Sequence, residues 1–268
     1  IRYLRKEILE IAPDVVLSFE EIYNSFVLLA LSFLKTRIYI SDRCQPERDL
    51  GLLNKVLKRI MYPMSYGIIA QTEKAKQVLF KQVKHRNIIV IPNPILKPNK
   101  SEIAKERIIL NVGRLIKSKQ QDILLNIFAQ INNHDWKLVF IGDGPEKGSL
   151  IDQCRSLKLS DQVQFVGNVS NVEDYYNRSR IFAFTSNSEG FPNALGEAMA
   201  ASNAVISFNC SSGPAELIDN GVNGFLVDLN DTETYKKRLQ LLVDDEGLCQ
   251  KFSVLAKKKM EKFSIENI

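Results

Sequence analysis

Short apolar runs alternate with segments of helical periodicity from the first residues of the chain onward. The runs have the length of buried strands, and the segments between them repeat apolar residues at helical spacing. The expected strands are 15–19, 37–41, 67–70 and 87–91, and the expected helices are 1–11, 21–34, 50–62 and 72–82. Thr72, at the start of the last of these helices, is a residue type that caps helices. This alternation predicts a parallel sheet with helices on both faces.

Two prolines within three residues interrupt the rhythm at Pro92-Asn93-Pro94. Proline disfavours both helices and central strands, so we expect the link between two domains over 92–104 and divide the chain into 1–97 and 98–268. A second alternating series follows, which predicts a second α/β domain. Its expected strands are 108–112, 136–141, 163–166, 181–184, 204–208 and 225–227. Its expected helices are 122–131, one ending at 157, 171–178, 193–201, one from 215, and two more at the C-terminal end.

Glycine-bearing loops follow four of the strands expected in the second domain. They contain Gly113-Arg114, Gly142-Asp143-Gly144-Pro145, Gly167-Asn168 and Glu189-Gly190. Ligands of open parallel sheets bind at the carboxyl ends of the strands, and glycine lets the backbone come close to a ligand. A single Gly-x-Gly is more often a plain turn, so a ligand site is expected only because all four loops should meet at one edge of the sheet.

The stretch 185–202 joins a strand to a glycine-containing turn and to the start of a helix. Backbone N–H groups at the N-terminus of a helix attract an anion. Glu189 lies in the loop and Glu197 about one turn into the helix. A glycosidase pair would flank an open cleft, whereas these two acids straddle a helix end. A phosphate between two sets of hydroxyl groups describes a nucleotide-sugar, and its ribose would give Glu197 the partner that a packed acid needs.

Arg114 and Lys119 are the cations placed to bind such a phosphate. Arg114 follows a strand and Gly113, and Lys119 is expected at the start of the next helix. A guanidinium group can hold one phosphate with two hydrogen bonds, while an ammonium group acts as a point charge on the next. If they did not lie at the expected ligand edge of the sheet, we would interpret both residues as ordinary surface cations. His85 and His134 lie in polar stretches and no Asp-x-Asp pair is present, so we expect no metal.

The basic residues are concentrated in the first segment. Residues 1–92 carry 15 Lys and Arg against 9 Asp and Glu, whereas the remainder carries 21 against 22. A solvated surface explains this, and attraction to anionic lipid or an anionic acceptor is the alternative. A nucleic-acid partner is not expected, because basic residues do not alternate with aromatic ones. The four scattered cysteines suit a reducing cytoplasm, and the longest apolar run is too short to span a bilayer.

These features together resemble the retaining family-4 glycosyltransferases of GT-B fold. The resemblance rests on Gly113-Arg114-Leu115 with Lys119, Gly142-Asp143-Gly144-Pro145, Phe165-Val166-Gly167, and Glu189-Gly190-Phe191-Pro192 followed by Glu197. Seven residues between the two glutamates is that family's signature. The similarity covers about 105–245, and extends to the first segment through Ser41-Asp42-Arg43-Cys44-Gln45-Pro46, which is similar to a stretch of bacterial surface-polysaccharide transferases.

This resemblance implies two Rossmann-like domains with a cleft between them, the N-terminal one incomplete. Residues 98–268 would bind the donor, with Arg114 and Lys119 on the diphosphate, Glu189 on the sugar and Glu197 on the ribose. The base would lie against Asn168-Val169. The implied donor-binding residues are Gly113, Arg114, Lys119, Asn168, Val169, Glu189, Gly190, Phe191, Pro192, Asn193 and Glu197. Glu189, Arg114 and Lys119 would be catalytic, and Asp42 and Arg43 are candidates for the acceptor side.

The implied reaction is the transfer of a hexose or N-acetylhexosamine, with retention of configuration. The donor would be a nucleotide-sugar, UDP-sugars first, and the acceptor a saccharide or a lipid-linked glycan in surface polysaccharide synthesis. Arg114 and Lys119 would stabilise the charge that develops on the leaving phosphate, without a cofactor or a metal. We expect a cytoplasmic protein and leave open a peripheral contact with the inner face of the cell membrane.

Three departures from the family pattern leave alternatives open. No first strand with a Gly-Gly loop precedes Ile1, no helix crosses back at the C-terminal end, and the usual first-domain histidine is missing, with Asp42 near its place. We therefore expect the first domain to lack one or two βα units. One alternative is a sugar-nucleotide epimerase of the same architecture, although the site loops lack histidine for acid–base work. The other is a nucleotide-binding fragment without turnover.

Overall fold

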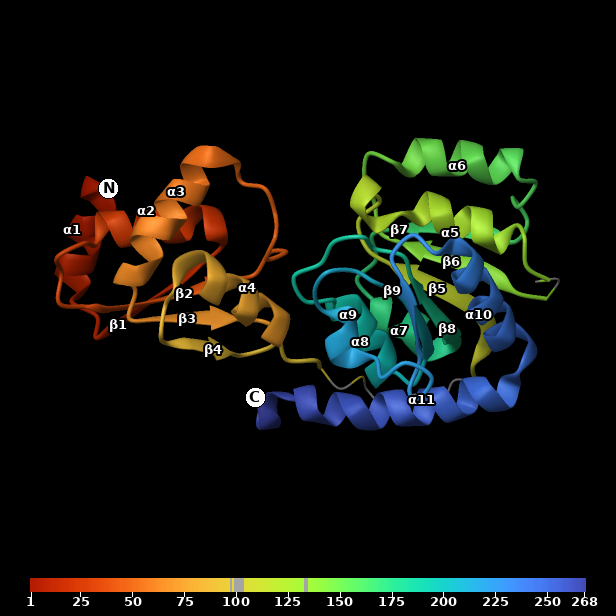
Figure 1. The fold of residues 1–268 in the computed structure, drawn as a ribbon. Helices are drawn as coiled ribbons and strands as arrows, with labels where there is room; N and C mark the ends of the chain where they lie inside the picture. The colour runs from red at the N-terminus through yellow and green to blue at the C-terminus, as the bar shows by residue number, and fades with distance from the viewer. Residues whose placement is uncertain (97, 99–103, 133–134) are drawn as a thin grey trace. The chain divides into compact units, whose positions relative to one another are not determined.

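The computed structural model describes residues 1–96, 98, 104–132 and 135–268. It divides the chain into two compact units (Figure 1). Unit 1 comprises Ile1–Asn93 with Glu189–Phe191, and unit 2 comprises Pro94–Ser188 with Pro192–Ile268. The first division falls after Asn93, whereas the sequence placed it after residue 97. The predicted link over 92–104 lies partly outside the described residues.

The described residues of unit 1 form a four-stranded parallel sheet in the order β1-β2-β3-β4. The strands are β1 (Val15–Phe19), β2 (Arg37–Asp42), β3 (Gly67–Ala70) and β4 (Ile88–Val90). The helices are α1 (Arg2–Ile11), α2 (Glu21–Ala30), α3 (Gly51–Met61) and α4 (Glu73–Val83), and the 3₁₀ turn η1 (Tyr62–Met64) follows α3. Thr72 caps α4 as predicted, because its Oγ1 accepts a hydrogen bond from Ala75 N–H at 3.0 Å.

The core of unit 1 lies on one face of its sheet. Ile40 of β2 and Ile68 of β3 are fully buried in it. On β1 the alternate side chains Val15, Leu17 and Phe19 are each 45% exposed. Alternate residues of a strand point to opposite faces, so these three share the other face. The prediction of helices on both faces is therefore wrong for β1 within the described part of the chain.

Unit 2 is built, in its described residues, on a six-stranded parallel sheet in the order β10-β9-β8-β5-β6-β7. The strands are β5 (Glu106–Val112), β6 (Lys137–Ile141), β7 (Val163–Gly167), β8 (Ser179–Phe184), β9 (Ala204–Asn209) and β10 (Phe225–Asp228). The chain runs outward from β5 to β7, returns to β8 beside β5, and then runs outward the other way. Its direction therefore reverses between β5 and β8, which is where such sheets bind ligands.

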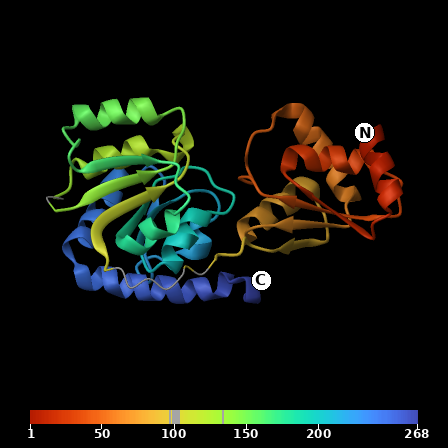
Figure 2. The ribbon, with the colours of Figure 1, turned by 180° about the vertical axis from the view of Figure 1, so that it is seen from behind.

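Helices cover both faces of this second sheet, as the sequence predicted. They are α5 (Gln121–Phe128), α6 (Lys147–Ser156), α7 (Val172–Arg178), α8 (Asn193–Ala200), α9 (Pro214–Leu217), α10 (Thr232–Asp244) and α11 (Glu246–Met260). Three 3₁₀ turns are η2 (Lys117–Lys119), η3 (Glu261–Phe263) and η4 (Ile265–Asn267). Within unit 2, α5 and α6 lie on one side of the strands and α11 on the other in both views (Figures 1 and 2).

Predicted and observed elements agree in kind and order, and the differences lie at their ends. The sequence extended one helix over 21–34, but α2 ends at Ala30. Phe33 has φ +67°, a left-handed conformation that interrupts an α-helix. Among the described residues, none of the helices is long and apolar enough to cross a bilayer.

Candidate active site

The loops that follow β5 and β8 meet at the reversal point of the unit 2 sheet. Ser118, in the loop after β5, accepts a hydrogen bond through its carbonyl from Asn187 N–H at 2.9 Å. The Thr185 hydroxyl donates to the Lys119 carbonyl, also at 2.9 Å. Because these bonds join the two loops, the cation-bearing segment and the start of the Glu189 loop lie side by side.

Lys119 occupies the junction of these two loops. It ends η2, and Gln120 with φ 50° separates it from α5, so it lies just before the helix at whose start it was predicted. Its Nζ lies 5.4 Å from the centre of the Phe184 ring, within the range of a cation–π contact. A Cβ placed on Gly113 would lie 3.7 Å from Lys119 Cε. Strand ends from both sides of the reversal point therefore surround this lysine.

Arg114 lies next to Gly113 at the carboxyl end of β5. Its backbone is fixed, since its carbonyl accepts hydrogen bonds from the Gln121 side chain at 3.1 Å and from Ile116 N–H at 3.0 Å. Its side chain is exposed, and no residue in the described ranges forms a hydrogen bond or ion pair with its guanidinium group. An anchored backbone with an uncompensated guanidinium suits the binding of an anion.

Gly142 and Gly144 allow the loop after β6 to pack against the loop after β5. Gly142 has φ +129°, and a Cβ there would lie 2.1 Å from the Gly113 carbonyl oxygen. A Cβ on Gly144 would lie 2.3 Å from the Leu115 carbonyl oxygen. The sequence predicted that these glycines bring backbone close to a ligand. In the structure they allow the loop after β6 to pack closely against the loop after β5, and this packing supports the backbone of Arg114.

Glu197 lies in the second turn of α8 and is half-buried. The hydroxyl of Tyr176, from α7, donates a hydrogen bond to its Oε2 at 3.0 Å. Burial and the adjacent Glu197 charge raise the pKa of the Tyr176 phenol far above its ordinary value, so the phenol stays a donor. The sequence predicted that Glu197 needs a partner but missed Tyr176. The pair of tyrosines on α7 was a signal, although it did not show which tyrosine faces α8.

The remaining residues of the predicted stretch directly precede α8 in the chain or begin it. Glu189, Gly190 and Phe191 group with unit 1, while Pro192 and Asn193 belong to unit 2. Gly213, in the loop after β9, has φ +99°, and a Cβ there would lie 2.4 Å from Pro192 Cδ. This loop reaches the start of α8 and was missed as a site segment. A Gly-Pro pair in the short loop after β9 was its signal.

Asn168 and Val169 follow β7, two strands away from β5 in the sheet. Asn168 is exposed and Val169 is half-buried. The loop is tied to its neighbour by a hydrogen bond of 2.9 Å from Gly142 N–H to the Gly167 carbonyl. The position at the same sheet edge is compatible with the predicted contact to a base, which stays a prediction.

Asp42 lies in a buried polar network of unit 1. It is 8% exposed and accepts hydrogen bonds from Tyr62 at 2.6 Å, Asn24 at 2.9 Å and Lys58 at 3.0 Å. Lys58 also pairs with Glu21. The neighbouring Arg43 bonds to the side chain of Asn93 and lies over the Phe19 ring, 5.4 Å from its centre. These contacts give Asp42 a structural role, and the predicted acceptor contacts of both residues stay untested.

No group of three His, Cys, Asp or Glu side chains within the described ranges is arranged to hold a metal ion. The His85 ring contacts the carbonyl of Ser65 at 3.0 Å, which accounts for it structurally. His134 falls outside the described residues. The four cysteines are free thiols.

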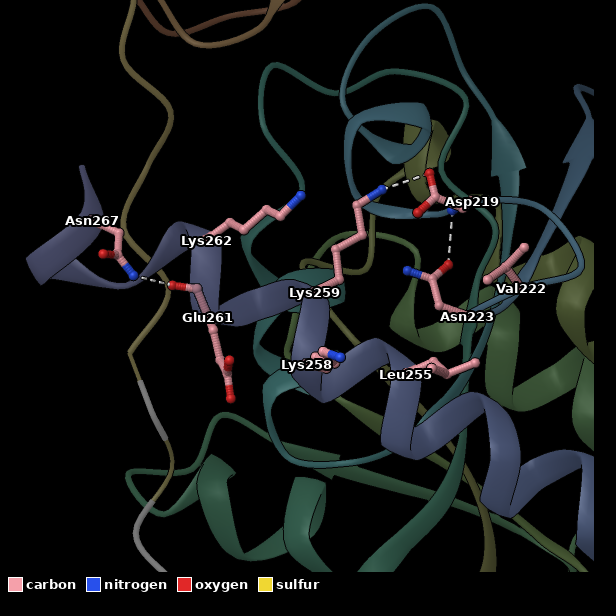
Figure 3. A pocket seen from close by; sticks show the side chains of 9 residues that line it. All are labelled: Asp219, Val222, Asn223, Leu255, Lys258, Lys259, Glu261, Lys262 and Asn267. Atoms are coloured by element: carbon pink, nitrogen blue, oxygen red, sulfur yellow. Dashed lines mark hydrogen bonds and ion pairs between the residues drawn. The ribbon is translucent and has the colours of Figure 1, made fainter.

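A pocket of about 810 Å³ lies elsewhere in unit 2 (Figure 3). Its wall is formed by the end of α11, by η3 and η4, and by the turn before β10. Lys259 donates to Asp219 across it at 2.7 Å. The turn leads into the amino end of β10, so this pocket lies away from the carboxyl ends of the strands, and the predicted residues do not line it.

The comparisons with known proteins agree on one family. The family model described as "Glycosyl transferases group 1" matches residues 94–259. An uncharacterized glycosyltransferase of Haemophilus influenzae is 34% identical over 75% of this chain and 58% of its own length. The amylovoran biosynthesis glycosyltransferase AmsD of Erwinia amylovora is 29% identical over 91% of this chain and 72% of its own. The chain thus spans little more than half of the Haemophilus relative.

Solved structures share the fold at low sequence identity. HepE of Anabaena, in complex with UDP, aligns with a TM-score of 0.88 at 19% identity, over 99% of this chain and 78% of its own. The pneumococcal O-GlcNAc transferase GtfA, in complex with UDP and GlcNAc, aligns with a TM-score of 0.84 at 18% identity, over 98% and 57%. These similarities confirm the fold class predicted from the sequence.

Proposed function

Because the chain belongs to the glycosyl transferases group 1 family and has the GT-B fold, we propose that it transfers a sugar from a nucleotide-sugar. The sugar is a hexose or an N-acetylhexosamine, and UDP carries it. The acceptor is a saccharide or a lipid-linked glycan in polysaccharide synthesis. The name of one Campylobacter jejuni relative, 28% identical over 99% of this chain, includes an undecaprenol-linked acceptor, which supports the lipid-linked class.

The observation that carries this proposal is the meeting of the loops after β5 and β8. The Thr185 and Asn187 bonds hold Lys119 beside the Glu189 loop, and Arg114 lies on the same sheet edge. The diphosphate binds to the Arg114 guanidinium and the Lys119 ammonium, and the N-terminus of α8 adds a favourable dipole. Glu197, one turn further along α8, binds the ribose, and Glu189 binds hydroxyls of the sugar.

Transfer proceeds with retention of configuration in this proposal. As the bond between the sugar and the phosphate breaks, the bonding electrons pass to the phosphate oxygen, which becomes more negative. Arg114 and Lys119 stabilise that charge. The acceptor hydroxyl oxygen forms the new bond to the anomeric carbon on the same face of the sugar, and its proton passes to the leaving phosphate. The two cations supply the positive charge, so the proposed reaction needs no metal. Activity that is lost in excess chelator and restored by a divalent cation would contradict this point.

Direct binding and product analysis test the proposal. Calorimetry with UDP, GDP and their sugars should show binding of UDP and UDP-sugars and weaker or no binding of GDP and GDP-sugars. NMR of the product formed from the matching sugar donor should show the anomeric configuration of the donor. An inverted product would refute retention. If the protein epimerises a nucleotide-sugar in the absence of an acceptor, its function is epimerisation and not transfer.

We further propose that unit 1 approaches an anionic membrane that carries the acceptor. Residues 1–92 hold the basic excess of the chain. On α3, Leu52 and Leu53 are 80% and 72% exposed and lie near the exposed Lys55. Apolar and basic side chains together favour binding to anionic lipid. Sedimentation with phosphatidylglycerol vesicles, but not with phosphatidylcholine vesicles, is expected, and equal sedimentation with both would contradict it.

A further inference from the structure

Tyr176 is fixed from three sides before it reaches Glu197. Its ring packs against Phe182 of β8 with ring centres 5.9 Å apart, and the residue is 3% exposed. Its carbonyl accepts hydrogen bonds from Asn203 Nδ2 at 2.8 Å and from Lys105 Nζ at 3.1 Å. A side chain held by its ring and by its own backbone can present its hydroxyl in only one direction.

The same two donors also bind the end of the helix that carries Glu197. Lys105 donates to the Ala201 carbonyl at 2.8 Å, and Asn203 donates to it at 3.3 Å. Ala201 is the C-cap of α8, and Tyr176 lies in the last turn of α7. Lys105 and Asn203 therefore tie the C-terminal ends of α7 and α8 together. This connection fixes the relative position of the two helices at the Tyr176–Glu197 hydrogen bond.

The hydrogen bond to Tyr176 leaves one carboxylate oxygen of Glu197 available. The Tyr176 hydroxyl occupies Oε2, and Oε1 receives no hydrogen bond from any described residue. An ionised carboxylate is an acceptor only, so Oε1 can accept from a ligand hydroxyl. Without Tyr176 the carboxylate would rotate among several orientations, and a ligand would have to order it on binding.

We propose that Tyr176 is a positioning residue that orients Glu197 so that Oε1 accepts a hydroxyl of the donor ribose. This inference rests on the proposed function, in which Glu197 binds that ribose. Tyr176 does not touch the substrate in this arrangement. Its effect on affinity is therefore transmitted through Glu197 and depends on the ribose hydroxyls.

Calorimetry with UDP and with 2′,3′-dideoxy-UDP tests the inference on the whole chain. Tyr176→Phe is expected to weaken UDP binding roughly tenfold. This factor corresponds to the loss of one charge-assisted hydrogen bond, here the bond that orients the Glu197 carboxylate. Binding of the dideoxy compound is expected to stay at the wild-type level, because it lacks the hydroxyls that Glu197 accepts. Unchanged dideoxy-UDP affinity also shows that the variant keeps its fold.

Tyr175→Phe is the matched control. It makes the same chemical change one residue earlier on α7, and no described residue bonds to the Tyr175 hydroxyl. It should leave both affinities unchanged. In a Glu197→Gln background, Tyr176→Phe should cause a smaller loss than in the wild type, because the shared carboxylate is gone.

The outcomes separate this inference from the function on which it rests. Equal UDP affinity of wild type and Tyr176→Phe overturns the inference and leaves the function intact. Equal losses for UDP and dideoxy-UDP overturn it as well, since they indicate a general structural role. Wild-type protein that binds neither UDP nor GDP overturns both the inference and the proposed function.

Discussion

Replacement of Lys58 by methionine should destabilise unit 1 strongly. Lys58 is 6% exposed, and its ammonium pairs with two buried carboxylates, Glu21 and, at 3.0 Å, Asp42. Methionine keeps most of the volume but leaves both acids without a cation. Removal of one partner from a buried ion pair costs about 3–5 kcal/mol of unfolding free energy, because a charge stays buried without compensation. The loss should be of that size at neutral pH.

The cost should become smaller as the pH falls. Burial raises the pKa of Glu21 above its ordinary value of 4.5, while Lys58 opposes that shift. Without Lys58 the pKa of Glu21 rises further, so the folded variant binds a proton that the unfolded chain does not. A group with a raised folded pKa adds stability as the pH falls through that pKa. The difference from the wild type should therefore shrink between pH 7 and about 4.5.

Urea unfolding with two probes measures this effect. Trp136, the one tryptophan of the sequence, reports unit 2 by fluorescence. Hydrogen exchange of peptides from 37–62, read by mass spectrometry, reports unit 1. The unfolding free energy of a small protein falls by about 1–3 kcal/mol per molar urea, so the urea midpoint of unit 1 should be roughly 2 M lower in Lys58→Met than in the wild type. Lys55→Met, an exposed lysine on the same helix, is the control. Equal midpoints for the two variants, or a difference independent of pH, would show that Lys58 does not compensate the buried carboxylates.

Three further substitutions have defined outcomes. Arg114→Ala should abolish sugar transfer in a turnover assay. Arg107→Ala, which replaces an exposed arginine at the opposite end of β5, should retain most of the activity. A turnover of Arg114→Ala close to that of the wild type would exclude Arg114 from the mechanism. Glu197→Ala should weaken UDP binding by about 1.5–3 kcal/mol in calorimetry, and an unchanged affinity would contradict the ribose assignment. Thr72→Ala should lower the unfolding free energy by about 1 kcal/mol in urea, through loss of the cap of α4.

Local pattern was sufficient for the order of elements and for some of their ends. The runs 15–19 and 67–70 match β1 and β3 to the residue, because short apolar runs between turn-forming residues specify a strand and its length. Pattern was not sufficient to decide which faces are covered. Val15, Leu17 and Phe19 are as apolar as a buried strand and yet are exposed, since coverage depends on segments distant in the chain.

The candidate site was likewise predicted from the sequence only in part. Arg114 and Lys119 were predicted because position after a strand places a residue at the ligand edge of a parallel sheet. Tyr176 was missed, because its bond to Glu197 joins residues 21 positions apart on two different helices and depends on how those helices pack. The order of elements places a residue on an edge. Only the packing shows which side chains touch there.

Charge itself carries little information until the partners are known. Lys58 lies in the last turn of α3 and Arg114 in the loop after β5, and composition does not distinguish them in a chain with 36 basic residues. Lys58 is buried and compensated by two carboxylates, so its charge stabilises the fold and is not available to a ligand. Arg114 is exposed, with its backbone bonded and its guanidinium unpaired in the described structure. An external anion gains more from an uncompensated cation, which supports the proposal that Arg114, together with Lys119, binds the diphosphate.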